Sequence, residues 1–251
     1  MPNTHSLYSD NYASKYVYIT DAAQTGLDLT TTLSIEAWIR FDTGQLPGTT
    51  LSACSIVNKY GGLGRAYKFY VGVSGAVANK LGLFLSDDGS NTVGHFLSFG
   101  GSTAFNVNTW YHVAVTFDVA TETCVMYVNG VAETVSLLTG TTFGSSIYNT
   151  ADDLIIGQYL GGYWDEVRVW NDIRTATEIE NNYQTELVGN EANLVAYWKF
   201  NNSALDETSN NNDLTLVNSP TYSTTIPDWG GEPPATVIKD MMGMGFIPFP
   251  R

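Results

Sequence analysis

The chain has 251 residues, of which 43% are hydrophobic and 13% aromatic, and this length and composition fit one large domain with a sizeable core. Its 25 acidic residues exceed its 11 basic ones, so the formal net charge is −14. A chain with this charge repels the phosphate backbone of a nucleic acid and an anionic membrane surface, and no apolar run is long enough to span a bilayer. We therefore expect neither a nucleic-acid partner nor membrane insertion.

Short runs rich in β-branched and aromatic residues follow one another along the first hundred residues, separated by loops that contain Gly, Asp and Asn. Such runs, at regular spacing and with turn residues between them, predict the strands of an all-β fold. The predicted strands lie near residues 7–8, 16–19, 55–60, 66–73, 81–86 and 95–99.

The most regular pattern lies between residues 109 and 130. Side chains alternate along a strand, so one face of the first run is fully apolar and the other is mixed. The apolar face carries Tyr111, Val113, Val115 and Phe117. A second strand covers 124–128, and the Asn129-Gly130 dipeptide after it tolerates positive φ in a two-residue turn. This pattern predicts a central hairpin that continues into a third strand.

One helix is predicted, over residues 174–187. Thr175 or Thr177 can cap its N-terminus, where acidic residues are favourable. Its apolar face, directed at the sheet, carries Ile179, Tyr183 and Leu187. Further strands are predicted at 194–200 and 214–217.

The composition changes near residue 226, because five of the eight prolines and three of the five methionines lie in the residues that follow. A segment so rich in proline and glycine cannot continue a sheet. We therefore divide the chain into a sandwich domain, residues 1–226, and a C-terminal tail, residues 227–251. The tail is too apolar to stay solvated and has no periodic face, so we expect it to dock on a protein partner or on another copy of the chain. The residues expected to dock are Met241, Met242, Met244, Phe246, Ile247 and Phe249.

Four stretches of the sequence resemble the laminin G-like domains of the concanavalin A-like lectin and glucanase superfamily. They are LSIEAWIRFD at 33–42, NTWYHVAVTFD and CVMYVNGV within 108–131, GGYWDEVRVWNDIRTATEIENNY at 161–183, and NLVAYWKFNNSALDETSNNNDLTLV at 193–217. The resemblance implies a two-sheet antiparallel jelly-roll sandwich of the concanavalin A-like type, with one short helix and an extended C-terminal tail outside the sandwich.

The resemblance also implies recognition of a glycan or another surface polymer. The sequence lacks the Glu-x-Asp-x-Glu strand that carries the catalytic carboxylates of the superfamily's glucanases, and consecutive Asp165 and Glu166 are expected on opposite faces of a strand. We therefore expect a non-catalytic module. A glycoside hydrolase that uses Glu36 and Glu166 as its acid pair is the less favoured alternative.

A structural calcium ion is a further implication of the resemblance. Asp165 stands at the equivalent of the strand that supplies a carboxylate to calcium in such domains, and Asp10 is expected across from it. The alternative for Asp165 is a surface aspartate that caps a turn or pairs with Arg168 or Lys15.

Polar loops at residues 60–65 and 87–91 are expected at one end of the sandwich, where exposed aromatic rings can stack on sugar rings. The candidate ligand-binding rim comprises Tyr60, Arg65, Asp87, Asp88, Asn91, Tyr159 and Tyr163. A second cation site at this rim is a weaker hypothesis, with Asp87-Asp88, Asn149 and Asp152-Asp153 as its ligands.

Other aromatic and sulfur-containing residues are expected inside the protein. The core should take Trp38, Trp110 and Trp198. The two cysteines, Cys54 and Cys124, are expected as buried free thiols, with a disulfide between them as the alternative.

The N-terminus has neither a basic nor an apolar region, so we expect no secretion signal, although a glycan-binding sandwich meets its ligand outside cells. We therefore expect a structural, decorating or fibre-type subunit of a larger assembly such as a phage virion, attached through its tail. Its location would be extracellular or on the virion surface. The alternative is a secreted or cell-surface carbohydrate-binding adhesion protein.

Overall fold

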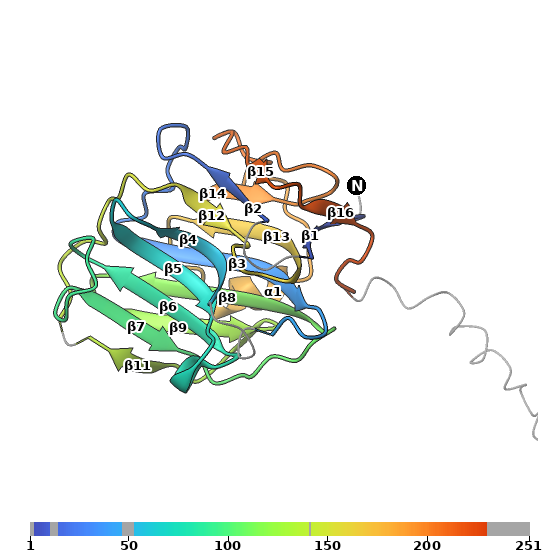
Figure 1. The fold of residues 1–251 in the computed structure, drawn as a ribbon. Helices are drawn as coiled ribbons and strands as arrows, with labels where there is room; N and C mark the ends of the chain where they lie inside the picture. The colour runs from blue at the N-terminus through green and yellow to red at the C-terminus, as the bar shows by residue number, and fades with distance from the viewer. Residues whose placement is uncertain (1–2, 11–14, 47–52, 141, 230–251) are drawn as a thin grey trace, which may run out of the picture.

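The computed structural model describes residues 3–10, 15–46, 53–140 and 142–229 (Figure 1). The expected docking residues of the tail, between Met241 and Phe249, lie outside this part of the chain. None of the helices in the described ranges is long and apolar enough to cross a membrane.

Eight strands form the first sheet, in the order β10-β9-β8-β3-β13-β1-β16, with β14 also paired to β13. Their bounds are β1 Ser6–Ser9, β3 Thr32–Phe41, β8 Trp110–Asp118, β9 Thr123–Val128, β10 Val131–Ala132, β13 Gly162–Trp170, β14 Leu194–Trp198 and β16 Thr221–Ser223. The predicted central hairpin is confirmed as β8-β9, and β10 pairs with β9 after the Asn129-Gly130 turn.

The second sheet also has eight strands, in the order β11-β7-β6-β5-β4-β12-β2-β15. Their bounds are β2 Tyr16–Ile19, β4 Cys54–Tyr60, β5 Arg65–Val71, β6 Leu81–Ser86, β7 Phe96–Gly100, β11 Ser136–Thr139, β12 Leu154–Ile156 and β15 Thr215–Val217. A short 3-10 helix, η2, covers Gly75–Val77. The named strands of both sheets pair antiparallel, so the expected all-β, two-sheet antiparallel sandwich is confirmed.

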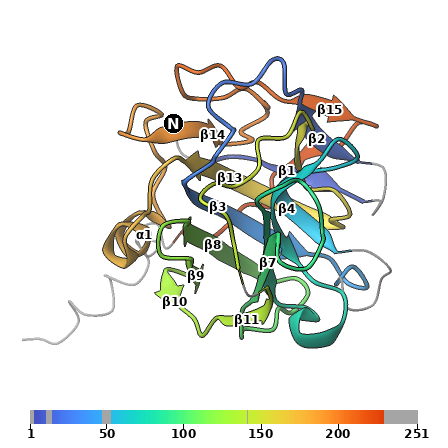
Figure 2. The same cartoon turned by 90° about the vertical axis from the view of Figure 1, so that its left-hand side faces the viewer.

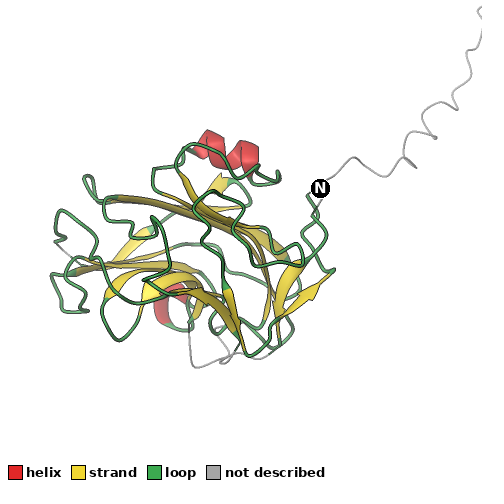
Figure 3. Cartoon of the chain, turned by 90° about the horizontal axis from the view of Figure 1, so that it is seen from above, coloured by secondary structure: helices red, strands yellow, loops and turns green. Residues whose placement is uncertain are grey.

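The core lies between the two sheets, which form two layers when the molecule is viewed from above (Figure 3). The predicted apolar face of β8 points into this core, where Val113, Val115 and Phe117 are fully buried. The opposite face of β8 is also buried, because α1 covers it: Ala114 packs with Ile179 of the helix. The central strands of the first sheet, β3, β8 and β13, are therefore largely buried on both faces, with the helix on one side and the second sheet on the other (Figure 2).

The helix α1 covers Ala176–Asn182 and is shorter than predicted. Its N-cap is Thr175, one of the two predicted caps, and a reciprocal capping box with Glu178 fixes its start. The carbonyl groups of Asn182 and Thr185 accept hydrogen bonds from a buried side chain of the sheet, Arg168, at 3.0 and 2.5 Å. These bonds hold the chain in a non-helical path, so the helix ends at Asn182 rather than at residue 187.

A buried lysine fixes the loop before β3 to the second sheet. Lys59 is 0% exposed, and its ammonium group lies 2.7 Å from Asp21 and also bonds to Asp28. The hydroxyl group of Tyr67 donates to the carbonyl of Leu27 in the same loop, at 2.9 Å. Two polar anchors thus hold this loop over the edge of the core.

Both cysteines are free thiols, as expected. Cys54 begins β4 in the second sheet and Cys124 lies on β9 in the first, so they belong to different layers. Burial raises the pKa of each thiol, which keeps both in the neutral form.

The C-terminal end of the sandwich lies slightly beyond the expected boundary at residue 226. The last strand, β16, ends at Ser223, but Pro227 is buried and Asp228 lines a surface hollow with Trp110 and Tyr183. The described chain therefore keeps contact with the domain past residue 226.

Candidate functional site

A β-bulge in β13 decides where the central acidic residues point. Asp165 pairs with Trp38 and Arg168 pairs with Glu36, so three steps along β13 match two steps along β3. Glu166, inside the bulge, has φ of 51°. Because of the bulge, Asp165 shares the helix-covered face with Glu166, which contacts Arg168. The prediction that these two carboxylates point to opposite faces is wrong.

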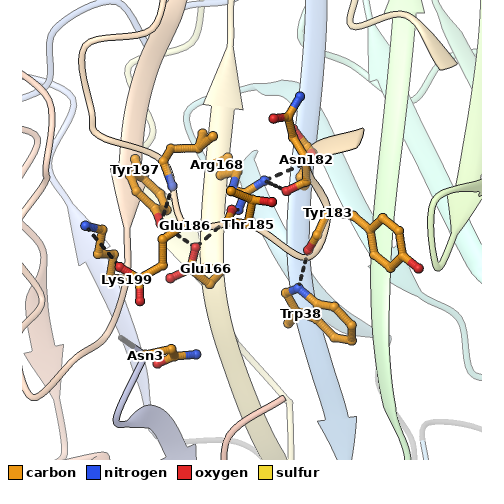
Figure 4. A network of polar contacts seen from close by, with 12 residues as sticks. Asn3, Trp38, Glu166, Arg168, Asn182, Tyr183, Thr185, Glu186, Tyr197 and Lys199 are labelled. Atoms are coloured by element: carbon orange, nitrogen blue, oxygen red, sulfur yellow. Dashed lines mark hydrogen bonds and ion pairs between the residues drawn. The ribbon is translucent and has the colours of Figure 1, made fainter. Parts of the chain in front are cut away.

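These residues form a buried polar network between the first sheet and the segment after α1 (Figure 4). Arg168 lies at its centre, 3.2 Å from Glu166 and 3.8 Å from Glu36. The Trp170 indole donates to Glu36 at 2.8 Å, and the Tyr197 hydroxyl donates to Glu166. Burial raises the pKa of Glu166 to about 7, although Arg168 opposes this shift.

The network contradicts the proposed hydrolytic acid pair. Glu36 and Glu166 are 2% and 1% exposed, and both carboxylates bind side chains of the same network. Glycoside hydrolysis needs two carboxyl groups that flank a bound glycosidic bond. Neither Glu36 nor Glu166 can reach a saccharide on the surface.

The expected calcium ligands Asp10 and Asp165 do not come together. Ser9 pairs with Gly162, so the antiparallel register carries Asp10 away from Asp165. Asp10 is exposed and pairs with Lys15. Asp165 is fully buried and is neither a turn cap nor a partner of Lys15: it accepts hydrogen bonds from the Asn3 amide at 2.7 Å and from the backbone of Glu166 at 2.9 Å.

Residues that interact with Asp165 carry oxygen atoms without partners. The side-chain oxygens Oδ1 of Asn3, Oε1 of Glu166 and Oε1 of Glu186 are buried and have no hydrogen-bond partner among the described residues. Burial, and then the neighbouring Glu166, raise the pKa of Asp165 well above its usual range. Carboxylate and amide oxygens of this kind are the donors that a hard cation such as calcium takes.

Three loops meet at one end of the second sheet and form the rim. The backbone of Arg65 donates to the Gly89 carbonyl at 3.0 Å, and Asp87 accepts from the Gly144 backbone at 2.5 Å. A third loop contributes Asp152, which accepts from the backbone of Gly64 at 2.8 Å. Five of the predicted rim residues gather here: Tyr60, Arg65, Asp87, Asp88 and Asn91.

The second predicted cation site does not form as expected. Asp152 holds the backbone of the 63–64 turn, whereas Asp87 lies 2.9 Å from His95, with Asp88 3.5 Å from the same ring nitrogen. The sequence reasoning missed His95, which stands eight residues further along the same hairpin. Among the described residues, Asp87, Asp88 and His95 form the one group of three acidic, histidine or cysteine side chains whose possible metal-binding atoms all lie within 4.8 Å of one another.

Two predicted rim residues lie elsewhere. Tyr159 follows β12 next to Ser55, whose backbone bonds to Gln158, and this is the end of β4 opposite to Tyr60. Tyr163 lies on the first sheet, with its ring 4.6 Å from Tyr8 and 5.9 Å from Trp110. Neither tyrosine joins the rim.

The indole of Trp110 is partly exposed, so the prediction that it belongs to the core is wrong, whereas Trp38 and Trp198 are buried. Trp110 lines a surface hollow of about 450 Å³ together with Trp38, Tyr183, Asn108, Asn129 and Asp228. This hollow lies on the helix-covered side of the molecule, away from the rim.

A row of aromatic rings continues from the rim over the outer face of the second sheet; we call Tyr60, Phe84 and Phe96 the aromatic strip. The ring of Phe84 lies 5.1 Å from that of Tyr60 and 5.2 Å from that of Phe96, and all three side chains are partly exposed. Lys68 and Tyr70 lie beside the strip, with the Lys68 ammonium 5.6 Å from the Tyr60 ring and 5.5 Å from the Tyr70 ring.

Two polar side chains lie under this face. Asn58 pairs with Lys68 and Ser55 pairs with Tyr70, and residues paired across strands point to the same side of a sheet. Both are buried, and neither the Asn58 amide nor the Ser55 hydroxyl has a hydrogen-bond partner in the described structure. Buried polar groups are nearly always paired, so this position is unusual and marks a place where a ligand can add hydrogen bonds.

Two antiparallel sheets packed face to face, with a loop rim at one end and aromatic rings on an outer sheet face, define a lectin-type β-sandwich. Residues 11–180 match the family described as the concanavalin A-like lectin/glucanases superfamily, in its laminin G-like branch. The chain belongs to this family. A search of curated protein sequences found no match.

Several solved structures are similar to this chain at low sequence identity. A candidate carbohydrate-binding protein from Bacteroides ovatus superposes with a TM-score of 0.62 at 20% identity, over 89% of this chain and 60% of that protein. The binding domain of Paraclostridial Mosquitocidal Protein 1 gives 0.46 at 14% identity, over 72% and 45%. The CBM40 module of a Ruminococcus gnavus IT-sialidase, bound to α2,3 sialyllactose, gives 0.47 at 14% identity, over 70% and 96%. The chain thus spans less than two thirds of the first two proteins, and these similarities concern the fold alone.

Proposed function

We propose that the protein is a non-catalytic recognition module that binds a glycan on the outer face of the second sheet. The observation that carries this proposal is the aromatic strip, which lies beside the unpartnered Asn58 and Ser55 and opens onto the rim. Aromatic rings stack on the apolar faces of sugars, while amide and hydroxyl groups bind sugar hydroxyls. The name given to the Bacteroides ovatus protein agrees with this class of ligand.

The non-catalytic part of the proposal follows from the position of the acidic residues. Glu36 and Glu166 are buried within the network around Arg168. At the rim, Asp87 and Asp152 bind loop backbone groups, which is a structural task. A hydrolase would need two carboxyl groups that face a bound sugar.

The proposal includes a structural calcium ion at Asp165, with Asn3 and Glu186 as further oxygen donors. The unpartnered oxygens of these two residues and the raised pKa of Asp165 support it. A bound ion would supply positive charge to the buried acids and link Asn3, ahead of β1, to β13. It would stabilise the fold and take no part in ligand chemistry.

The proposal also includes attachment to a larger assembly, such as a virion, through the apolar residues of the tail. The composition of residues 227–251 supports it, because methionines and an extended Phe-Ile-Pro-Phe-Pro segment suit a groove on a neighbour. Such a subunit would present its aromatic strip on the outside of the assembly. An adhesion protein at a cell surface would use the same binding face.

Incorporation of a chain that ends at Asp228 tests this attachment. The truncated chain should fold, because it keeps every strand that the structure describes, but should fail to enter the assembly or to form oligomers with the mass of the full chain. Normal incorporation would show that the tail has no docking role.

A glycan array followed by binding measurements tests the recognition function. Phe84→Ala and Tyr60→Ala should each weaken binding by about tenfold or more, since stacking on one ring contributes on the order of 1–2 kcal/mol. Tyr159→Ala is the matched control, because it removes a ring at the other end of the sheet. Release of reducing sugars would show a hydrolase instead, and no binding to any polysaccharide would refute the recognition function.

A further inference from the structure

The basic residues of this acidic protein fall into two groups. Eleven Lys and Arg residues face 25 acidic ones, and six of the nine in the described ranges pair with a carboxylate. Three have no acidic partner among the described residues: Arg65, Lys68 and Lys80. All three belong to the β5-β6 region of the second sheet, since Arg65 and Lys68 lie on β5 and Lys80 directly precedes β6.

Two of these unpaired cations lie against the aromatic strip. The Arg65 guanidinium is 5.1 Å from the Tyr60 ring, and its Nε is buried with no hydrogen-bond partner in the described structure. The Lys68 ammonium lies between the rings of Tyr60 and Tyr70, and burial lowers its pKa. A desolvated cation without a carboxylate is costly, so a ligand that brings negative charge binds here with an advantage that a neutral ligand lacks.

The acidic residues Asp87 and Asp152 of the rim bind groups other than these two cations. Asp87 is occupied by His95 and the Gly144 backbone, and Asp152 by the backbone of the 63–64 turn. Arg65 and Lys68 therefore remain cations without an ion pair on the outer face of the second sheet, within a protein of formal charge −14.

We infer that this face selects acidic glycans, with a sugar carboxylate bound by Arg65 and Lys68 and the sugar ring stacked on the aromatic strip. This inference rests on the proposed glycan-binding function and adds the class of glycan. The planar guanidinium of Arg65 fits a carboxylate with two parallel hydrogen bonds. Asn58 pairs with Lys68 across the strands. An anion that draws the flexible Lys68 side chain outward therefore exposes the Asn58 amide to a sugar hydroxyl.

Binding of the full chain to polygalacturonate and to the same polymer after reduction of its carboxyl groups tests the inference. The acidic polymer should bind at least about tenfold more tightly than the reduced one, and added salt should weaken it. Arg65→Gln and Lys68→Met should each bring the ratio of the two affinities, acidic polymer over reduced polymer, closer to one. Arg174→Gln removes the same charge from a paired arginine beside α1 and should leave it unchanged.

The outcomes separate the inference from the function on which it rests. Equal binding of both polymers would overturn the acidic preference and leave the glycan-binding function intact, whereas binding to no glycan would overturn both. A second measurement uses a sialylated oligosaccharide. Tighter binding to it than to polygalacturonate would show that the recognised carboxylate belongs to a terminal sugar, and the reverse would show that it belongs to sugars within a chain. Poly-glutamate that binds as tightly as either glycan would show that charge alone is recognised and would refute the inference. Unchanged melting temperatures confirm that the variants are folded.

Discussion

Replacing Arg168 with methionine tests whether the network beneath α1 stabilises the fold through a compensated buried charge. Methionine keeps the apolar stem but leaves Glu36 and Glu166 without their shared cation. It also removes the donors to the carbonyls of Asn182 and Thr185. Removing one partner of a buried ion pair costs about 3–5 kcal/mol, and an orphaned carbonyl adds about 1 kcal/mol, so we expect a loss of about 5 kcal/mol near pH 8.

The loss should become smaller in acid. Burial raises the pKa of Glu166 to about 7 even beside Arg168, and Arg168 also helps to hold the pKa of Glu36 below its usual value. Without the cation, both carboxyl groups should have folded-state pKa values above their unfolded ones. Such groups contribute stability at low pH that is lost as the pH rises through the folded-state pKa. The defect of R168M should therefore be smallest near pH 5 and largest near pH 8.

Urea denaturation followed by tryptophan fluorescence at both pH values measures this. Arg174→Met is the matched control, since Arg174 pairs with Glu178 at the surface and its loss should cost about 1 kcal/mol or less. A loss for R168M below about 1 kcal/mol, or one of the same size at both pH values, would refute the argument from buried charge.

Three further changes follow from the same structure. Glu166 has a folded-state pKa of about 7, so wild-type stability should fall as the pH rises from about 4.5 through 7, and Glu166→Gln should flatten this slope in the denaturation profile. Lys59→Met should cost about 3 kcal/mol in urea denaturation, because Asp21 and Asp28 lose a buried cation; an unchanged midpoint would show that the loop needs no such anchor. Chelation should lower the melting temperature of the wild type and leave that of Asp165→Asn unaffected, since an ion bound only to the folded state stabilises it. Identical wild-type melting curves with and without chelator would refute the proposed calcium site.

The strands were predictable because their pattern is local. In β8 the alternation of Val113, Val115 and Phe117 with more polar residues identifies both the strand and its core face, and the Asn129-Gly130 turn fixes where its partner β9 ends. The capping box of α1 was readable in the same way. The end of the helix was not, because it depends on Arg168, which belongs to a distant strand.

The bulge in β13 had no local signal. Positive φ usually falls on glycine or asparagine, but here Glu166 adopts it, and the pairing with β3 on one side and β14 on the other holds it there. One extra residue changed the face of every side chain that follows, which is why the two acids were expected on opposite sides. Asp10 was misplaced for a related reason, since only the register of β1 shows its distance from Asp165.

The binding face was only half visible in the sequence. Tyr60 and Arg65 stand in a glycine-rich loop that attracts attention, whereas Phe84 and Phe96 lie in apolar strands and look like core residues. Their register shows the difference: Phe84 pairs with Ser98 and with Lys68 on the outer face, while Leu83 and Leu85 point inward. The alternation of Lys68 and Tyr70 with Phe69 in β5 was the signal that could have identified the outer face, on which Phe84 pairs with Lys68.

Strands from both ends of the chain complete the first sheet, and this limits where the domain can be divided. Strand β1 precedes residue 11 and β14 and β16 follow residue 180, yet all three pair within the sheet that contains β13. The matched family segment, residues 11–180, therefore omits the strands on one side of β13. Alone, it would expose that edge of β13 and would uncover Arg168, which bonds to Thr185. A genetic unit that transfers this module intact must carry both flanks, so recombination breakpoints should fall before residue 6 and after residue 223.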